Sequence, residues 1–410
     1  MNSGRIVIVG GGAAGFFAAL ACADAQSRAE ILILEKSSQV LSKVKISGGG
    51  RCNVTHACFN EREFATRFPR GERALIAPFK QFQAGDTVAW FAARGVKLKT
   101  ESDGRMFPIT DSSQTIIDCL VNAARAAKVK LKTNCGVERA VKKSGAGFEL
   151  TLSNGEMLTC DQLLLATGGC RTPALGHLAV SLGHTLEMPV PSLFTFHIAT
   201  PWLRALAGVS VETVEVSVAG TKLRERGALL ITHWGLSGPA ILRLSAWGAR
   251  VLHGMDYHCT LRVNWLPHLS DETITGEFAA RRKSQAARLV VNSPVIPLPA
   301  RLWEQLVLAA GLARETRWSA LSRSGQHALI QQLLRAEYSV TGKSLNKDEF
   351  VTCGGVKLDE VDFKTMQSRI CPGLFFAGEL LDIDGITGGF NFQAAWTTGW
   401  IAGRAMARGE

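Results

Sequence analysis

The chain has 410 residues, of which 46% are hydrophobic and 20% charged, and its 46 lysines and arginines exceed its 35 aspartates and glutamates by +11. This composition excludes a disordered chain and predicts two or three folded domains. No apolar run reaches the roughly 20 residues of a membrane helix. The basic balance favours anionic partners such as nucleotides or RNA, although an ordinary solvated surface explains it equally well.

The ten cysteines contain no Cys-x-x-Cys pair. This argues against a thioredoxin-type redox couple and a zinc knuckle, so we expect no metal site. The apolar segment 5–9 runs directly into a glycine loop and reads as a strand rather than a signal peptide. We therefore expect a cytoplasmic protein with reduced, mostly buried thiols and no membrane partner.

The first 35 residues predict a strand at 5–9, a helix at 13–25 and a second strand at 30–34. Between strand and helix lies Gly10-x-Gly12-x-x-Gly15, whose glycines suit a tight turn, a close approach to pyrophosphate and close helix–strand packing. Glu35 follows the second strand, where an acid accepts hydrogen bonds from a ribose. The pattern predicts a dinucleotide site; the alternative is a glycine turn with no ligand.

A second glycine-rich segment spans Ser47 to Asn53 and contains Gly48, Gly49 and Gly50. Consecutive glycines are favoured where the backbone passes close to a ligand. We expect Arg51 to contact pyrophosphate or a substrate anion, and the Asn53 amide to face the edge of the bound cofactor. The alternative is a flexible surface loop.

The next elements predict an α/β domain that is interrupted. We expect a helix at 112–127, strands at 129–133 and 136–142, a hairpin at 147–160, and a buried strand at 162–166 that meets a ligand at its carboxyl end. Residues 192–265 alternate as in an antiparallel sheet, and 270–340 have a helical pattern. No second GxGxxG has a βαβ context, so NAD(P)H would have to dock transiently.

The pattern of strand, glycine turn and helix returns near the end of the chain. A short strand at 374–377 leads to Gly378 and Glu379, where an acid suits the ribityl hydroxyls of a flavin. Gly388 and Gly389 then open a helix whose amides would face the flavin pyrimidine edge and stabilise negative charge there. With the N-terminal loop, this turn predicts FAD rather than NAD.

In the interrupting region, the turn 232–239 contains His233. This side chain is a candidate proton donor during substrate reduction, although a lone histidine is more often structural. Nothing in the sequence forms a Ser-His-Asp set.

In order, five motifs make the chain resemble the aminoacetone oxidase (BaiN/RdsA-like) family of FAD-dependent oxidoreductases: 10–15, 47–53, 166–169, 232–239 and 377–389. The resemblance implies an α/β fold with a Rossmann-like FAD-binding domain of the GR2 flavoprotein type at 1–190 and 351–410. It also implies an inserted β-barrel-like domain at 191–269 and 341–350, and a small helical subdomain at 270–340. It implies further that Val137 contacts the adenine through its backbone.

The expected ligand is non-covalent FAD, with His233, Arg51 and Asn53 as candidate catalytic residues. The expected cofactor-binding residues are Gly10, Gly12, Ala14, Gly15, Glu35, Lys36, Gly48, Gly49, Gly50, Arg51, Cys52, Asn53, Val137, Ala166, Thr167, Gly168, Gly378, Glu379, Gly388, Gly389, Phe390 and Asn391.

The leading hypothesis is an FAD-dependent oxidoreductase that takes hydride from NAD(P)H and reduces a C=C or similar bond in a small molecule. An alternative is a dihydrouridine synthase acting on ribosomal RNA, motivated by two basic clusters, at 125–143 and at 281–288. Family activities leave open a small-amine oxidase using O₂, and FAD could instead serve a non-enzymatic RNA-associated protein. We expect no DNA partner, and the sequence leaves the oligomeric state open.

Overall fold

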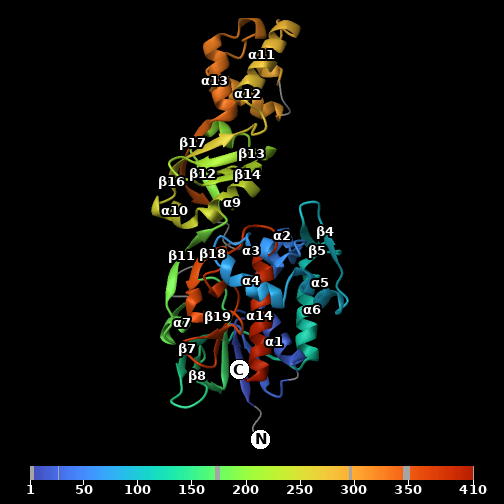
Figure 1. The fold of residues 1–410 in the computed structure, drawn as a ribbon, viewed down its shortest axis with the longest axis vertical. Helices are drawn as coiled ribbons and strands as arrows, with labels where there is room; N and C mark the ends of the chain where they lie inside the picture. Colours follow the sequence, from blue (N-terminus) through green and yellow to red (C-terminus); the bar gives the residue numbers. More distant parts are fainter. Residues whose placement is uncertain (1–3, 26, 171–175, 295–297, 345–350, 410) are drawn as a thin grey trace. The chain divides into compact units, whose positions relative to one another are not determined.

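The computed structural model describes residues 4–25, 27–170, 176–294, 298–344 and 351–409 (Figure 1). They form two compact units. Unit 1 comprises Met1–Ser192 and Lys347–Glu410, and unit 2 comprises Leu193–Asn346. Unit 2 is therefore a continuous insertion between two segments of unit 1.

A seven-stranded sheet forms the centre of unit 1, in the order β19-β20-β21-β10-β1-β2-β6. The strands from β21 to β6 run parallel, and the inner ones are almost entirely buried and apolar, as expected of a sheet covered on both faces. The strands are β1 (Arg5–Val9), β2 (Glu30–Leu34), β6 (Lys130–Lys132), β10 (Gln162–Leu165), β19 (Val361–Asp362), β20 (Gln367–Ser368) and β21 (Leu374–Phe376).

Two helices from opposite ends of the chain, α1 (Ala13–Asp24) and α14 (Phe390–Arg408), lie side by side in Figure 1. They approach closely because α14 has glycines at the contact. A Cβ atom at Gly399 would lie 2.4 Å from the carbonyl oxygen of Ala14, and one at Gly403 would lie 2.2 Å from that of Ala18. The first and last parts of the chain are therefore packed backbone against backbone.

The remaining helical segments of unit 1 connect and flank the sheets. They are α2 (Ser42–Gly50), α3 (Glu61–Ala65), α4 (Glu72–Gln81), α5 (Ala84–Ala92), α6 (Ser113–Ala126), α7 (His177–Ser181), η4 (Leu358–Glu360) and η5 (Gly378–Leu380).

Three small antiparallel sheets complete the described part of unit 1, in the orders β3-β5-β4, β7-β8-β9 and β11-β18. Their strands are β3 (Thr55–His56), β4 (Leu98–Thr100), β5 (Arg105–Pro108), β7 (Val137–Lys142), β8 (Phe148–Leu152), β9 (Met157–Cys160), β11 (Leu186–Ser192) and β18 (Val351–Val356).

Unit 2 contains a closed six-stranded barrel in the order β12-β15-β14-β13-β16-β17. Its strands are β12 (Thr195–Ile198), β13 (Ser210–Val218), β14 (Arg224–Ile231), β15 (Gly235–Ser237), β16 (His258–Asn264) and β17 (Ala336–Ser344), with helices α8 (Pro201–Arg204), α9 (Pro239–Trp247) and α10 (Ala249–Gly254). Closure leaves the barrel without free edges.

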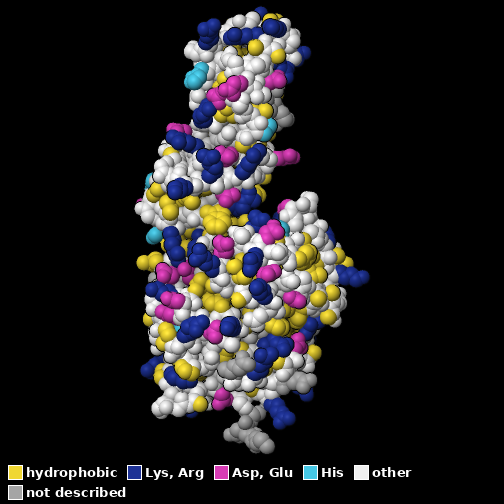
Figure 2. All heavy atoms as spheres, in the orientation of Figure 1, with side chains coloured by type: hydrophobic (Ala, Val, Ile, Leu, Met, Phe, Trp, Pro, Cys, Tyr) yellow, Lys and Arg dark blue, Asp and Glu magenta, His cyan; other side chains and the backbone are white. Residues whose placement is uncertain are grey.

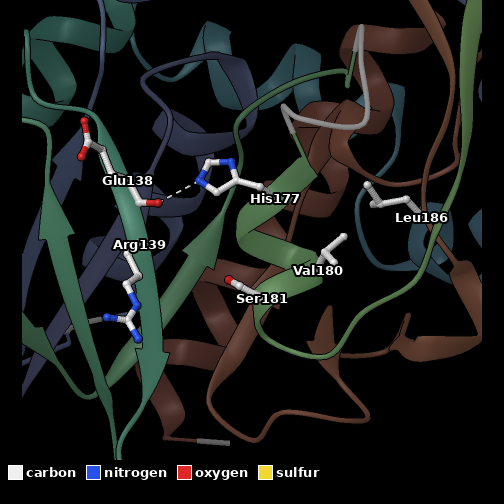
Figure 3. Close-up of a pocket in the computed structure, with 6 residues that line it drawn as sticks. All are labelled: Glu138, Arg139, His177, Val180, Ser181 and Leu186. Atoms are coloured by element: carbon white, nitrogen blue, oxygen red, sulfur yellow. Dashed lines mark hydrogen bonds between the residues drawn. The ribbon is translucent and has the colours of Figure 1, made fainter.

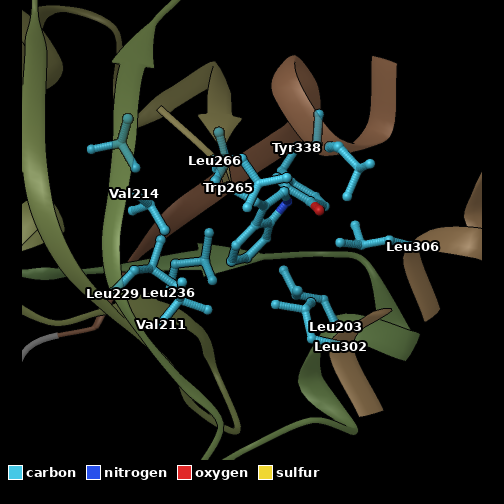
Figure 4. Packing of buried hydrophobic residues seen from close by; sticks show 14 of the residues in the cluster. Leu203, Val211, Val214, Leu229, Leu236, Trp265, Leu266, Leu302, Leu306 and Tyr338 are labelled. Atoms are coloured by element: carbon cyan, nitrogen blue, oxygen red, sulfur yellow. The ribbon is translucent and has the colours of Figure 1, made fainter. Parts of the chain in front are cut away.

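A helical part lies between β16 and β17 and shares one continuous core with the barrel (Figure 4). Trp265 from the barrel side lies in the same cluster as Leu302 and Leu306 of α12. The helical elements are α11 (Asp271–Ser284), η2 (Val290–Asn292), α12 (Ala300–Ala309), η3 (Trp318–Ala320) and α13 (Arg323–Leu334).

The predicted α/β class, with a Rossmann-like domain and a barrel, is confirmed. The prediction of a helical pattern up to residue 340 is wrong, because α13 ends at Leu334 and β17 begins at Ala336. Buried Ala336, Tyr338 and Val340 alternate with exposed residues, which is the period of a strand. The predicted barrel segment 341–350 is strand only to residue 344, and 345–350 lie outside the described residues.

Candidate functional site

The glycine loop between β1 and α1 is constrained on one side and open on the other. A Cβ atom at Gly15 would lie 2.0 Å from the carbonyl oxygen of Gly10, and one at Gly10 would lie 2.3 Å from that of Ala166. A Cβ atom at Gly12 would meet nothing within 4 Å, and no side chain caps the helix that begins after it. The backbone amides at this helix N-terminus therefore have the room and polarity for an anionic group.

Glu35 lies directly beside this loop. Its carboxylate accepts hydrogen bonds from the Gly11 amide at 2.8 Å and from the amide and hydroxyl of Ser37, each at 2.8 Å. Its own carbonyl oxygen accepts from the Cys135 amide at 2.8 Å, which brings the start of β7 at Val137 to the same place. Glu35 and Val137 therefore occupy neighbouring positions, while Lys36 is exposed next to them.

The second glycine segment is a helix end that unwinds. Helix α2 extends to Gly50, but Ser47 is extended and Gly48 and Gly49 have positive φ angles of 57° and 69°. Cys52 also has a positive φ, of 62°, and is fully buried, and burial raises the pKa of its thiol to about 12. The glycines here allow left-handed backbone that other residues rarely adopt.

Arg51 points to protein partners. Its guanidinium pairs with Glu101 at 2.6 Å, lies 3.5 Å from Asp111, and sits 3.9 Å from the ring centre of Phe107. These contacts hold Arg51 between a carboxylate pair and an aromatic face, so any contact with a ligand anion would compete with an existing ion pair.

Asn53 links the second glycine segment to the C-terminal turn. With its amide assigned so that both ends are satisfied, its nitrogen donates to the Thr55 carbonyl at 3.0 Å and its oxygen accepts from the Gly389 amide at 2.9 Å. Gly389 itself has φ +90°, and a Cβ atom there would lie 2.5 Å from the Thr55 carbonyl oxygen. Asn53 thus fixes the position of the turn that begins α14.

The C-terminal turn is held from several directions. The side chain of Asn391 donates to the Gly385 carbonyl at 2.9 Å and accepts from the Gly385 amide at 2.8 Å. Phe390 is buried and stacks on His56 with ring centres 4.8 Å apart. A Cβ atom at Gly388 would lie 2.7 Å from the Phe390 ring, so this turn has space for glycine alone.

Glu379 accepts from the Thr352 amide at 2.8 Å and forms an ion pair with Lys43 of α2. A Cβ atom at Gly169 would lie 2.7 Å from its carboxylate. These contacts bring together α2, the end of β10, β18 and η5, which are far apart in the sequence.

The carboxyl ends of four neighbouring parallel strands gather the motifs at one edge of the sheet. Val9 pairs with Leu34 and Leu165, and Leu165 pairs with Phe376. The residues that follow these strands, including Gly10 and Ala166, therefore meet at one edge. At such an edge α/β proteins bind ligands. Beyond Ala166, Thr167 is exposed, and a Cβ atom at Gly168 would meet nothing within 4 Å.

His233 belongs to unit 2. It is exposed on the turn between β14 and β15, next to Trp234, which is 62% exposed and stacks on His197 at 5.9 Å. His233 therefore belongs to a different unit from the glycine motifs.

Sequence reasoning missed a buried cluster at the C-terminal turn. Asp384 is fully buried, pairs with Arg70 through both carboxylate oxygens and accepts from the Ser192 hydroxyl at 2.7 Å. Burial raises the pKa of Asp384 to about 6, more than Arg70 lowers it. It also missed His56, whose pKa burial lowers. No spacing rule connects these residues, because their partners come from distant segments.

A separate cavity of about 570 Å³ is formed by residues of unit 1 (Figure 3). It is lined by Glu138, Arg139, His177, Val180, Ser181 and Leu186. His177 of α7 reaches the Glu138 carbonyl at 2.9 Å. On β7 the cavity is lined by Glu138 and Arg139, which directly follow Val137. None of its lining residues belongs to a glycine motif.

Among the described residues, no group of three or more histidine, cysteine or carboxylate side chains could hold a metal ion. No helix in the same part of the chain is long and apolar enough to cross a membrane.

A family model described as the HI0933-like protein Rossmann domain matches residues 4–405. The chain belongs to the HI0933-like family. A 3-dehydro-bile acid delta(4,6)-reductase of Clostridium scindens is 30% identical to it, covering 98% of this chain and 99% of that protein. A ribosomal RNA dihydrouridine synthase of Escherichia coli K12 is 32% identical, over 98% and 97%.

Solved structures show the same fold in more distant proteins. A 3-ketosteroid delta1-dehydrogenase from Sterolibacterium denitrificans has a TM-score of 0.54 at 13% identity, covering all of both chains. A flavocytochrome c3 fumarate reductase has a TM-score of 0.52 at 18% identity, covering 99% of this chain and 78% of that one. This HI0933-like protein therefore has a Rossmann-type FAD-binding domain, and it is an FAD-dependent oxidoreductase. The non-enzymatic alternative is not supported.

Proposed function

We propose that the protein uses FAD to reduce a C=C bond conjugated with a carbonyl group, with NAD(P)H as the source of hydride. The activities for which the two relatives are named support this chemistry. A 3-dehydro-delta(4) steroid and a uracil ring both contain such a bond, and both names describe its saturation. In the proposed reaction the substrate gains a hydride and a proton, and NAD(P)H is oxidised to NAD(P)⁺.

The observation that carries the proposal is that the N-terminal glycine loop and the C-terminal segment that follows β21 leave neighbouring parallel strands at the same sheet edge. The open space at Gly12 and the uncapped start of α1 fit a pyrophosphate, and Glu35 is beside them for ribose hydroxyls. Bound FAD would supply a two-electron carrier between hydride donor and substrate.

Each remaining motif has a proposed role toward the same group. We assign Val137 to the adenine end, Gly168 and Glu379 to the middle of the cofactor, and Gly388 with Gly389 to the flavin end. In this assignment Asn53 and Asn391 are positioning residues, because their amides bond the backbone of the C-terminal turn. Arg51 would reach an anion only by leaving Glu101.

The test is an anaerobic assay of the purified protein with its FAD. We expect NADH or NADPH to bleach the flavin absorbance, and a 3-keto-4-ene steroid or a uridine-containing transcript to restore it with formation of the saturated product. Failure to bind FAD, or a bound flavin that neither nucleotide reduces, would disprove the proposal. Peroxide formed on addition of a small amine in air would favour the amine-oxidase alternative.

The proton-donor role of His233 is tested separately. If it donates the proton, His233→Asn lowers the rate of substrate reduction by about 10²–10⁴-fold, while flavin reduction by NAD(P)H is unchanged. If the variant has the wild-type rate in both half-reactions, the histidine has no such role.

A second candidate substrate, uracil in ribosomal RNA, is favoured by the distribution of charge. Unit 2 has seventeen lysines and arginines against ten aspartates and glutamates, whereas the larger unit 1 has 29 against 25. Most of the net charge therefore belongs to the unit that does not carry the glycine motifs, as expected if that unit contacts a polyanion.

A further inference from the structure

The two basic segments of the sequence differ in how their charges are satisfied. In the first, at 125–143, Lys130 pairs with Glu30 and Lys132 lies 3.4 Å from Glu156. Lys142 donates to a backbone carbonyl at 2.6 Å and lies 4.4 Å from the ring centre of Phe148. Of the seven lysines and arginines in this segment, three therefore use their charge within unit 1, two of them in ion pairs.

The second segment belongs to a group of six cations in unit 2, which we call the α11 cluster: Arg281, Arg282, Lys283, Arg288, Arg317 and Arg323. None of the six forms an ion pair with another described residue. Elsewhere in unit 2, Arg262, Arg314 and Arg335 each pair with a carboxylate. The α11 cluster thus keeps its charge available to a partner outside the chain.

Backbone contacts bring Arg288 and Arg317 of the cluster together. The Trp318 amide donates to the Arg288 carbonyl at 3.0 Å, and Leu289 forms an antiparallel bridge with Arg317. The Trp318 ring packs 5.4 Å from that of Phe278, one turn before the basic end of α11. Residues more than 30 positions apart in sequence are therefore held on the same part of unit 2.

Helix stability explains only part of the cluster. Arg281, Arg282 and Lys283 are in the last turn of α11, where cations complement the helix dipole. Arg323, however, is the first residue of α13, where a cation is unfavourable, and Arg288 and Arg317 belong to neither helix. Half of the cluster therefore has no structural explanation within the fold.

The residues around the cluster favour RNA over an anionic membrane as its partner. A membrane-binding basic surface also needs exposed apolar side chains that enter the lipid. None of the large exposed hydrophobic residues of the described chain lies between 270 and 335. Figure 2 shows Lys and Arg side chains along α11 and α13 without a large apolar patch beside them.

We infer that the α11 cluster is a docking surface for the phosphate backbone of RNA, which holds the substrate while a uracil is reduced elsewhere in the protein. This inference rests on the ribosomal RNA form of the proposed function. Phosphate contacts of this kind give affinity without sequence preference and are strongly weakened by salt.

The test uses the full-length FAD-loaded protein and a charge-reversal variant, Lys283→Glu/Arg288→Glu/Arg317→Glu. All three side chains are exposed and unpaired, so the fold and FAD content should not change. The matched control is Lys80→Glu/Lys97→Glu/Lys364→Glu, which changes the net charge equally on exposed positions of unit 1. Binding to in vitro transcribed ribosomal RNA is measured by fluorescence anisotropy over a range of NaCl concentrations.

We expect the α11 variant to bind the transcript at least about tenfold more weakly. The slope of log affinity against log salt concentration should decrease in magnitude by about two to three. The control should lose less than about twofold, and both proteins should keep the wild-type rate of flavin reduction by NAD(P)H. An α11 variant with wild-type affinity and slope overturns the inference, as does wild-type protein that binds phosphatidylserine vesicles but no RNA.

Failure of the proposed function gives a different result. In that case the wild-type protein would form no dihydrouridine in the transcript, whether or not the charge reversal changed RNA binding.

Discussion

Unit 1 is assembled from both ends of the chain, whereas unit 2 is one continuous stretch. In unit 1 the contacts that matter most are between backbones: Gly15 with Gly10, and Gly399 with Ala14. In unit 2, by contrast, Arg288, Arg317 and Arg323 are exposed charged side chains that helix stability does not explain. The comparison teaches that a methyl group added at these glycines should disrupt the packing of unit 1. A changed charge on the surface of unit 2 should instead alter the binding of a partner. In the proposed function, cofactor binding and RNA binding therefore belong to different parts of the sequence.

The largest effect is expected for Gly15→Val. Its side chain would begin 2.0 Å from a carbonyl oxygen, so we expect α1 to lose its packing and the protein to be recovered without FAD or insoluble. Gly12→Asp is the informative counterpart, because that position is open. It should keep the wild-type melting temperature of the FAD-free protein and lose FAD binding, measured by flavin fluorescence. FAD binding by Gly12→Asp would contradict the assigned pyrophosphate position.

A cavity in unit 2 should have a smaller effect. Trp303 is fully buried and its indole donates to the Val290 carbonyl at 2.8 Å. Trp303→Ala should cost about 3–5 kcal/mol of unfolding free energy. If the two units unfold independently, calorimetry should show one transition at a lower temperature while FAD content at room temperature is unchanged. Loss of FAD from this variant would show that the cofactor site depends on unit 2.

The buried carboxylate of unit 1 predicts a dependence on pH. Burial raises the pKa of Asp384 from 3.8 in the unfolded chain to about 6 in the folded one. Folding therefore favours the protonated form, and this contribution to stability is complete below the unfolded value and disappears as the pH rises through about 6. Urea unfolding should show that the stability difference between wild type and Asp384→Asn decreases as pH rises across this interval. A difference that stays constant would exclude Asp384 as the titrating group.

The smallest effect is expected in the first basic segment. The pairs formed by Lys130 and Lys132 are exposed, so Lys132→Ala should change the unfolding free energy by less than about 1 kcal/mol. Lys130→Ala/Lys132→Ala should also change RNA affinity by less than about twofold, because these charges already have partners. A loss as large as that of the α11 variant would remove the distinction between the two segments.

The parts of the site that sequence could predict are those set by local backbone geometry. The positions of Gly10, Gly12 and Gly15 follow from what a strand–turn–helix connection requires within a few residues. The predicted strands at 5–9 and 30–34 are confirmed for the same reason, since buried parallel strands have continuous apolar runs.

What the sequence could not predict depends on partners far away along the chain. The contact of Arg51 with Glu101 spans 50 residues, and that of Asp384 with Arg70 spans 314. The strand at Ala336–Ser344 was missed because its alternation directly follows a helix with no glycine or proline between them. The first basic segment forms ion pairs and the α11 cluster does not, and this difference likewise cannot be predicted without the fold.

The pairing of β10 with β21 has a consequence for how the protein is made. Leu165 is synthesised before the whole of unit 2, and its neighbour Phe376 only after it. During translation, which proceeds from the N-terminus, unit 2 can therefore close its barrel while the central sheet still lacks an inner strand. Helix α14, which packs on α1, emerges later still. Loading of the cofactor should consequently be one of the last events in biosynthesis, and a ribosome-bound chain that ends before residue 388 should carry a folded barrel and no flavin.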